Sequence, residues 1–145
     1  MRIRLSLAII LATNLLLGIA VVKAEPVSQY EQLRTQLFAG VATTAIFSPA
    51  ECQNPASTAA PRALSGGLAI RDFFEVAGKN IGFANQHLTV RADGTTVLEL
   101  VQYRALPDDT GTVTVRSLSP VTYQPLSAAQ VFQCTLGKGL RFVHG

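Results

Sequence analysis

Two histidines are the side chains of this sequence best suited to acid–base chemistry near neutral pH. His87 lies within a predicted strand, and His144 is next to last in the sequence. A serine nucleophile needs an adjacent base and an orienting carboxylate, and no serine here stands in a Gly-x-Ser-x-Gly turn. We therefore interpret His87 as a sheet residue that hydrogen-bonds locally or faces solvent, and His144 as part of a fraying terminus.

The carboxylates do not form a catalytic pair either. Asp72 and Glu75 are three positions apart on a predicted strand, so their side chains point to opposite faces. Asp108 and Asp109 follow a proline in a predicted turn, where aspartates bond the local backbone, and no calcium-loop spacing surrounds them. The sequence thus predicts no acid–base pair and no calcium site.

Glu99 and a Gly-Lys-Gly sequence are the last candidates for chemistry. Glu99 interrupts an apolar strand face and is expected to meet solvent, Arg71 or Arg104. A phosphate-binding loop needs Ser or Thr after Gly-Lys and a second glycine upstream, and residues 137–139 have neither. We interpret them as a tight turn beside a disulfide. We predict no catalytic, metal-binding or cofactor-binding residue, and a protein that is not an enzyme.

The two cysteines of the sequence, Cys52 and Cys134, are predicted to form a structural disulfide. Two free thiols or a redox pair are the alternatives. No Cys-x-x-Cys is present, and two cysteines without clustered histidines make a poor zinc site.

The first 24 residues have the three parts of a secretory signal peptide. Arg2 and Arg4 form a basic tip, residues 5–22 are mostly apolar, and small residues precede a polar turn. We predict cleavage between Ala24 and Glu25, which leaves residues 25–145 as a single β-rich domain. An uncleaved membrane anchor is the alternative, because eighteen residues approach the lower limit for spanning a bilayer.

Removal of this segment also removes the net positive charge of the chain. Arg2, Arg4 and Lys23 are three of the twelve basic residues, and all nine acidic residues follow position 24. The mature chain is therefore formally neutral, and nucleic-acid binding is not predicted.

The pattern of apolar residues predicts one helix followed by an antiparallel β domain. Ser28 and Glu31 fit a capping box, Leu33 and Leu37 continue an apolar stripe, and Gly40 supplies the stop. Asp93-Gly94 predicts a hairpin with a type I′ turn. The strand at 95–106 is apolar on both faces, so cover is expected on both. Predicted strands are 41–47, 68–77, 81–92, 95–106, 112–118, 131–136 and 140–144. The expected fold is mainly β: an antiparallel meander forming a twisted sheet or partial barrel, with the N-terminal helix packed on it.

The closing region contains two specific segments, Leu118-Ser119-Pro120-Val121-Thr122-Tyr123 and Phe132-Gln133-Cys134-Thr135-Leu136-Gly137-Lys138-Gly139-Leu140-Arg141-Phe142. Further features are residues 33–40, Cys52, Gly66-Gly67, His87 and Tyr103-Arg104. With these features the chain resembles, from end to end, the VirK family of small proteins from plant-interacting and symbiotic bacteria. The resemblance implies an association with virulence and a Gram-negative export route, and it brings no enzymatic activity, cofactor or catalytic residue.

Together these observations predict an exported, virulence-associated accessory protein of the periplasm or the extracellular space. It would bind a partner protein or a small ligand without catalysis, and would keep no stable membrane anchor after cleavage. The alternatives are an uncharacterised periplasmic enzyme, with His87 as its best residue, and a membrane-tethered envelope component.

Overall fold

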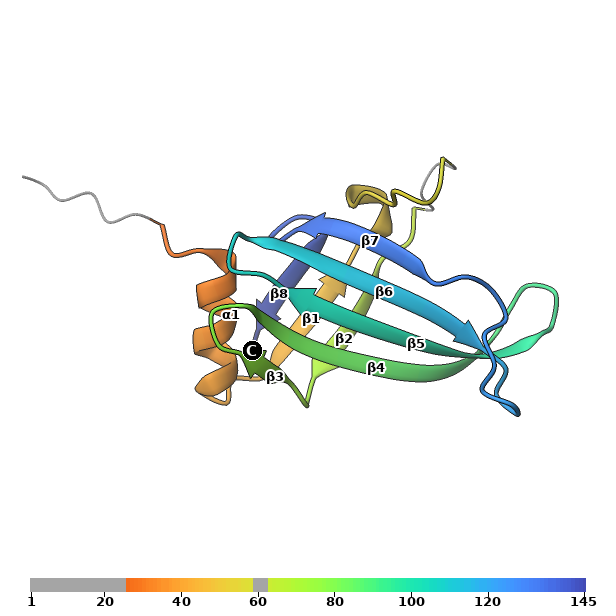
Figure 1. Cartoon of the computed structure of the whole chain (residues 1–145). Coiled ribbons are helices and arrows are strands. Elements are labelled where there is room, and N and C mark those ends of the chain that lie inside the picture. The colour runs from red at the N-terminus through yellow and green to blue at the C-terminus, as the bar shows by residue number, and fades with distance from the viewer. Residues whose placement is uncertain (1–25, 59–62) are drawn as a thin grey trace, which may run out of the picture.

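The computed structural model describes residues 26–58 and 63–145, which fold into two antiparallel sheets and one α-helix (Figure 1). A three-stranded sheet has the order β2-β1-β8, and a five-stranded sheet has the order β3-β4-β5-β6-β7. The prediction of a mainly β fold with an N-terminal helix is confirmed. The elements are α1 (Gln29–Phe38), β1 (Thr43–Phe47), η1 (Pro49–Glu51), β2 (Gly66–Ile70), β3 (Phe74–Val76), β4 (Asn80–Val90), β5 (Thr96–Ala105), β6 (Thr110–Leu118), β7 (Gln130–Thr135) and β8 (Leu140–His144).

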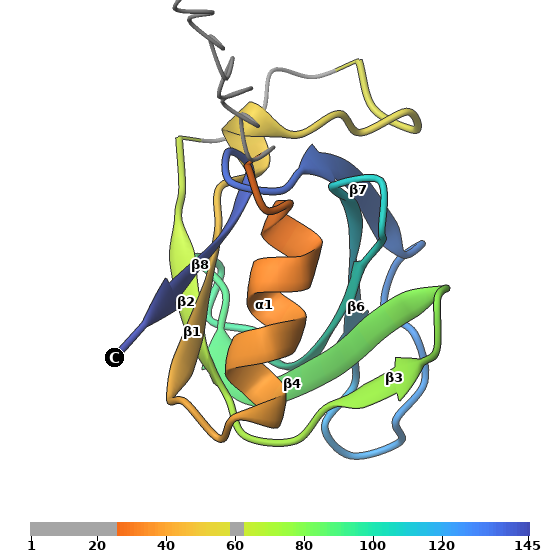
Figure 2. The ribbon, with the colours of Figure 1, turned by 90° about the vertical axis from the view of Figure 1, so that its left-hand side faces the viewer.

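The two sheets face each other, and α1 lies at one end between them (Figure 2). Aromatic side chains from both sheets fill the space between the layers. Phe83 stacks on Tyr103 with ring centroids 4.8 Å apart, and Phe47 meets Phe132 edge to face at 5.3 Å. Burial raises the pKa of the Tyr103 hydroxyl. The helix adds Tyr30, Leu33 and Leu37 to the same core.

The N-terminus of α1 is held by a carboxylate from the β5–β6 turn. Asp109 accepts hydrogen bonds from the backbone N–H groups of Gln29 (3.1 Å) and Tyr30 (2.8 Å), while Ser28 Oγ accepts from Glu31 N–H. These bonds satisfy N–H groups that a helix leaves without partners, and a negative charge here favours the helix dipole. Local backbone bonding was predicted for both aspartates of the turn; the Asp108 side chain has it, whereas the partners of the Asp109 side chain are 79 and 80 positions away.

The neighbouring Asp108 stabilises the turn that presents Asp109. Its carboxylate accepts hydrogen bonds from the side chain and the backbone of Thr110, which lower the pKa of Asp108 below its ordinary value. Asp109 itself has a φ of 59°, in the left-handed region that aspartate tolerates better than most residues. The turn is therefore built to aim one carboxylate at α1.

A disulfide joins the two sheets near the β5–β6 turn, where Cys134 pairs with Gly111. Cys52 follows η1, which continues from β1, and Cys134 lies on β7; the Sγ atoms are 2.07 Å apart. Gln53 and Gln133 exchange backbone hydrogen bonds of 2.8 Å beside it. Gly139 packs against this link, because a Cβ at that position would overlap Cys52 Sγ. Residues 137–139 form the predicted tight turn, with Gly137 at a φ of 81°.

Two details of the predicted strands were wrong. The segment 68–77 is not one strand: Leu68 and Ile70 pair with β1, whereas β3 pairs with β4 in the other sheet. The alternation of apolar residues runs through the crossing, so it does not mark the change of sheet. At the β4–β5 hairpin, Gly94 has a φ of 84° but Asp93 has no positive φ, so the predicted type I′ turn is absent.

We expect both cysteines of the native protein to resist a maleimide in denaturant until a reductant is added. Replacing both by alanine should lower the free energy of unfolding by up to roughly 4.5 kcal/mol, because the link closes a long loop in the unfolded chain. Urea unfolding with and without reductant measures this. Labelling of either thiol without reductant contradicts the disulfide.

We expect Asp109→Asn to lower the free energy of unfolding by about 1–2 kcal/mol, because the helix loses a charged cap while asparagine still tolerates the left-handed backbone. Asp72→Asn is the matched control, since this carboxylate is exposed and makes no hydrogen bond or ion pair with any described residue. Urea unfolding followed by circular dichroism compares them. Equal stability of the two variants would exclude a stabilising role of the Asp109 contact.

Candidate functional site

The five-stranded sheet has an inner face toward the core and an outer face that no described helix or strand covers (Figures 1 and 2). In-register pairing places Phe83, Tyr103 and Val113 side by side on the inner face, and it places Gln86, Leu100 and Arg116 side by side on the outer face. Of the two apolar faces predicted for β5, only the inner one is covered, because α1 and the three-stranded sheet both pack there. The expectation of cover on both faces was wrong.

Two residues that were considered from the sequence for acid–base chemistry, His87 on β4 and Glu99 on β5, meet on the inner face. His87 Nε2 lies 3.1 Å from Glu99 Oε2, and pairing places Ser117 on the far side of Glu99. In a serine hydrolase the histidine stands between the serine and the carboxylate. Here the carboxylate stands in the middle, so the row cannot relay a proton from Ser117 to His87. His87 contacts a carboxylate on the neighbouring strand and stays half exposed, whereas Glu99 meets His87 and not the suggested Arg71 or Arg104.

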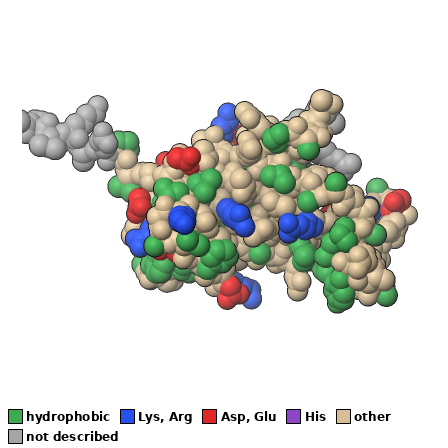
Figure 3. Space-filling model, in the orientation of Figure 1, with side chains coloured by type: hydrophobic (Ala, Val, Ile, Leu, Met, Phe, Trp, Pro, Cys, Tyr) green, Lys and Arg blue, Asp and Glu red, His purple; other side chains and the backbone are tan. Residues whose placement is uncertain are grey.

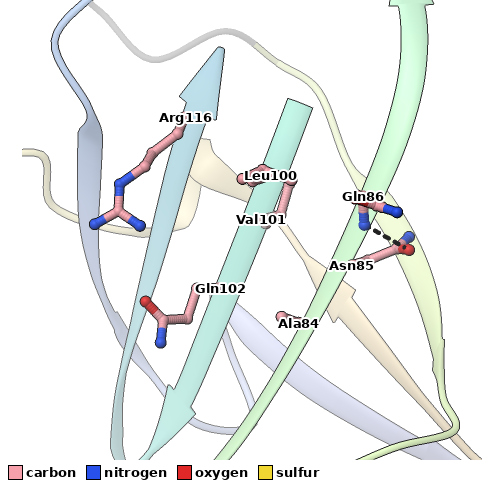
Figure 4. A pocket seen from close by; sticks show the side chains of 7 residues that line it. All are labelled: Ala84, Asn85, Gln86, Leu100, Val101, Gln102 and Arg116. Atoms are coloured by element: carbon pink, nitrogen blue, oxygen red, sulfur yellow. Dashed lines mark hydrogen bonds between the residues drawn. The ribbon is translucent and has the colours of Figure 1, made fainter. Parts of the chain in front are cut away.

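A shallow hollow of about 470 Å³ lies on the outer face, near the middle of the long strands (Figure 4). Leu100 and Ala84 belong to its lining, with Gln86, Gln102 and Arg116 around them. Arg116 is exposed, and no described carboxylate pairs with it. The hollow thus combines apolar side chains with the Arg116 guanidinium and three amide-bearing residues, Asn85 included.

Large apolar side chains are exposed where β4 and β6 end. We name this group the distal surface: Leu88 (65% exposed), Val90 (63%), Val121 (84%), Tyr123 (67%) and Leu126 (45%). In Figure 3 hydrophobic side chains gather at the right-hand end of the sheet, next to basic side chains of the outer face. Pairing of Leu88 with Leu98, and of Leu98 with Leu118, makes an apolar row across three strands at this end, in which Leu88 is exposed and Leu118 is buried.

Tyr123 is held in an unfavourable backbone conformation. Its φ of 58° is in the left-handed region, which costs a residue with a Cβ about 1–2 kcal/mol. The turn around it is well bonded: Tyr123 N–H donates to Ser119 O, and Ser119 N–H donates to Gln124 O, both at 2.9 Å. Ser119 Oγ accepts from the N–H groups of Val121 and Thr122. An ordered, strained turn therefore presents an aromatic ring to solvent.

The remaining predicted candidates have structural roles. Glu75 lies on β3 and binds Arg34 Nε of α1 at 2.7 Å, while Asp72 is exposed between β2 and β3. His144 is not frayed, because β8 pairs with β1 and His144 Nδ1 lies 3.1 Å from Thr43 Oγ1. The predicted cleavage site at Ala24 and Glu25 lies outside the described residues.

Within the described ranges, no three His, Cys, Asp or Glu side chains cluster as metal ligands. In the same ranges, no helix has the length and apolar character needed to cross a membrane. A second open hollow lies near the disulfide, lined by residues that include Glu51, Thr112, Gln133 and Lys138.

Sequence reasoning did not identify the outer face as a candidate site. Leu88 and Val90 follow Gln86 at alternate positions. An apolar face of a sheet produces this alternation whether or not another layer covers it. Only the three-dimensional arrangement shows that the covering layer is missing. The one available signal was the position of Val121, Tyr123 and Leu126 between prolines and small residues, where a core strand is not expected.

Comparison with known proteins agrees with this fold. The crystal structure of lpg1832, a VirK family protein from Legionella pneumophila, superposes with a TM-score of 0.71 at 12% identity, covering 80% of this chain and 96% of that one. The uncharacterized protein y4wH of Sinorhizobium fredii is 25% identical over 115 residues, 79% of each chain. An uncharacterized protein from the pinF2 3′ region of Rhizobium radiobacter is 25% identical over 77 residues, 53% of each chain. The family model described as VirK protein matches residues 26–123, so this chain belongs to the VirK family.

Proposed function

We propose that this protein is an exported binding protein without catalytic activity, and that it binds a protein partner through the distal surface. The observation that carries the proposal is the group of five exposed apolar side chains at the ends of β4 and β6. Contiguous exposed apolar groups are uncommon on monomeric proteins and often mark interaction sites.

The packing of the core favours a protein partner over a small ligand. Aromatic side chains fill the space between the sheets, and both surface hollows are open. Small-molecule sites usually bury most of their ligand. An open sheet face next to an ordered loop is better suited to the surface of another protein.

The strained backbone of Tyr123 supports the same surface. Strained residues persist only where the surroundings hold them, and they cluster at functional sites. The Tyr123 ring is exposed, so it adds little to the core. Tyrosine is also among the residues that contribute most to binding at protein interfaces.

Export is proposed from the sequence of residues 1–24, with cleavage between Ala24 and Glu25, and the Cys52–Cys134 disulfide fits an oxidising compartment. The periplasm or the extracellular space would then be the site of action, and a role in virulence follows from the family resemblance. Amino-terminal sequencing of the protein from the cells that produce it tests this proposal. An intact amino terminus at Met1 would contradict it.

Site-specific crosslinking in the producing cell tests the binding surface. A photoreactive amino acid at Leu88 or Tyr123 should give the same discrete crosslinked partner. The matched control is His87, which neighbours Leu88 but lies on the opposite face of β4. Identical adducts at His87 and Leu88, or no adduct at either Leu88 or Tyr123, would reject the distal surface.

We expect Tyr123→Gly to separate stability from binding. Glycine removes a backbone cost of about 1–2 kcal/mol but adds an unfolded-state entropy cost of about 0.5–1 kcal/mol, so the stability should stay equal or rise slightly. Crosslinking of the partner from Leu88 should fall strongly, because the ring is lost. Thermal unfolding and crosslinking yield measure the two effects, and Tyr123→Asn serves as a second variant that tolerates the left-handed backbone. Unchanged crosslinking in both variants would contradict a role of Tyr123 in binding.

A further inference from the structure

The outer face of the five-stranded sheet carries charge of one sign only. Its two charged side chains are Arg104 and Arg116, both exposed, and none of these five fully described strands adds a carboxylate to this face. The residues on this face are Phe74 and Val76; Asn80, Gly82, Ala84, Gln86, Leu88 and Val90; Thr96, Leu98, Leu100, Gln102 and Arg104; Thr110, Thr112, Thr114, Arg116 and Leu118; and Val131, Gln133 and Thr135.

Arg116 is the charge best placed to meet a partner. It borders the hollow, in the same row as Gln86 and Leu100, and it is one row from the apolar row of Leu98 and Leu118. Elsewhere in the described chain, charged side chains on facing elements do pair, as Arg34 does with Glu75. Because no described carboxylate pairs with Arg116, its guanidinium is available for a bidentate hydrogen bond to a carboxylate of a partner.

The positive charge of this face helps to distinguish three possible binding partners: a second copy of this chain, a small carboxylate and a segment of another protein. A second copy bound through the same face would place arginines of one sign opposite each other, which an interface disfavours. A small carboxylate would stay largely exposed in an open hollow. A protein segment with an acidic side chain and apolar side chains matches both the guanidinium and the apolar row.

Resting on the proposed function, we propose that the partner presents an extended segment with an Asp or Glu two positions from a large apolar residue. The acidic side chain binds Arg116 within the hollow, and the apolar side chain packs on Leu98 and Leu88, where it meets the distal surface. The spacing follows from sheet geometry: successive rows of one face are about 7 Å apart, which is the distance between alternate residues of an extended chain.

Selection from a random peptide library displayed on phage tests this proposal with the mature protein as bait. Selected peptides should be enriched in Asp or Glu two positions from Leu, Ile, Phe or Tyr. Arg116→Glu should weaken a selected peptide at least about tenfold, a loss of about 1.4 kcal/mol, and a fresh selection on this variant should prefer Lys or Arg. Arg141→Glu is the matched control, because Arg141 is also exposed but lies on the three-stranded sheet.

The outcomes separate this proposal from the proposed function. Peptides that depend on Leu88 but keep their affinity with Arg116→Glu would overturn the acidic segment and leave the distal surface standing. Selected peptides that are indifferent to both Leu88→Glu and Arg116→Glu would overturn both. Three further outcomes would also overturn the acidic segment. The first is equal weakening of peptide binding by Arg141→Glu, and the second is complete displacement of the peptide by benzoate at equal concentration. The third is a dimer of the bait that Arg116→Glu strengthens.

Discussion

The contact between Asp109 and the first turn of α1 determines how the two sheets are closed. The helix lies at the end between the sheets, where it buries Tyr30, Leu33 and Leu37. Its own sequence explains its start and stop, but not its position. That position is set by a carboxylate that reaches the N–H groups of Gln29 and Tyr30 from a turn far along the chain. The Glu75 carboxylate of β3 also binds Arg34, so a second charged contact accompanies the apolar packing of the helix.

The sequence was most informative where local chemistry decides the structure. The capping serine, the alternating strands and the glycine turns each depend on a few neighbouring residues, and the helix and β8 were located closely. The division of strands between two sheets could not be predicted, because Leu68 and Phe74 belong to one alternating pattern that only Asp72 interrupts. Sheet membership depends on pairing with distant strands, which the pattern of one segment does not specify.

The same limit applies to the candidate site. His87 and Glu99 were identified from the sequence as candidates for acid–base chemistry. The register of β4 and β5 places them opposite each other, but not in the order that a proton relay from a serine requires. The outer face was missed because its apolar residues look like core residues in the sequence. Whether a side chain is exposed depends on where the rest of the chain packs. Leu88 and Val90 can be recognised as exposed only once α1 and the three-stranded sheet are placed on the inner face.

The position of β1 has a consequence for how the molecule is made. β1 lies in the middle of its sheet and pairs with β2 on one side and with β8, at 140–144, on the other. A nascent chain that still lacks those residues cannot complete this sheet. Pairing between segments so distant in the sequence also slows folding. The three-stranded sheet can therefore form only when the synthesis of the chain is nearly finished.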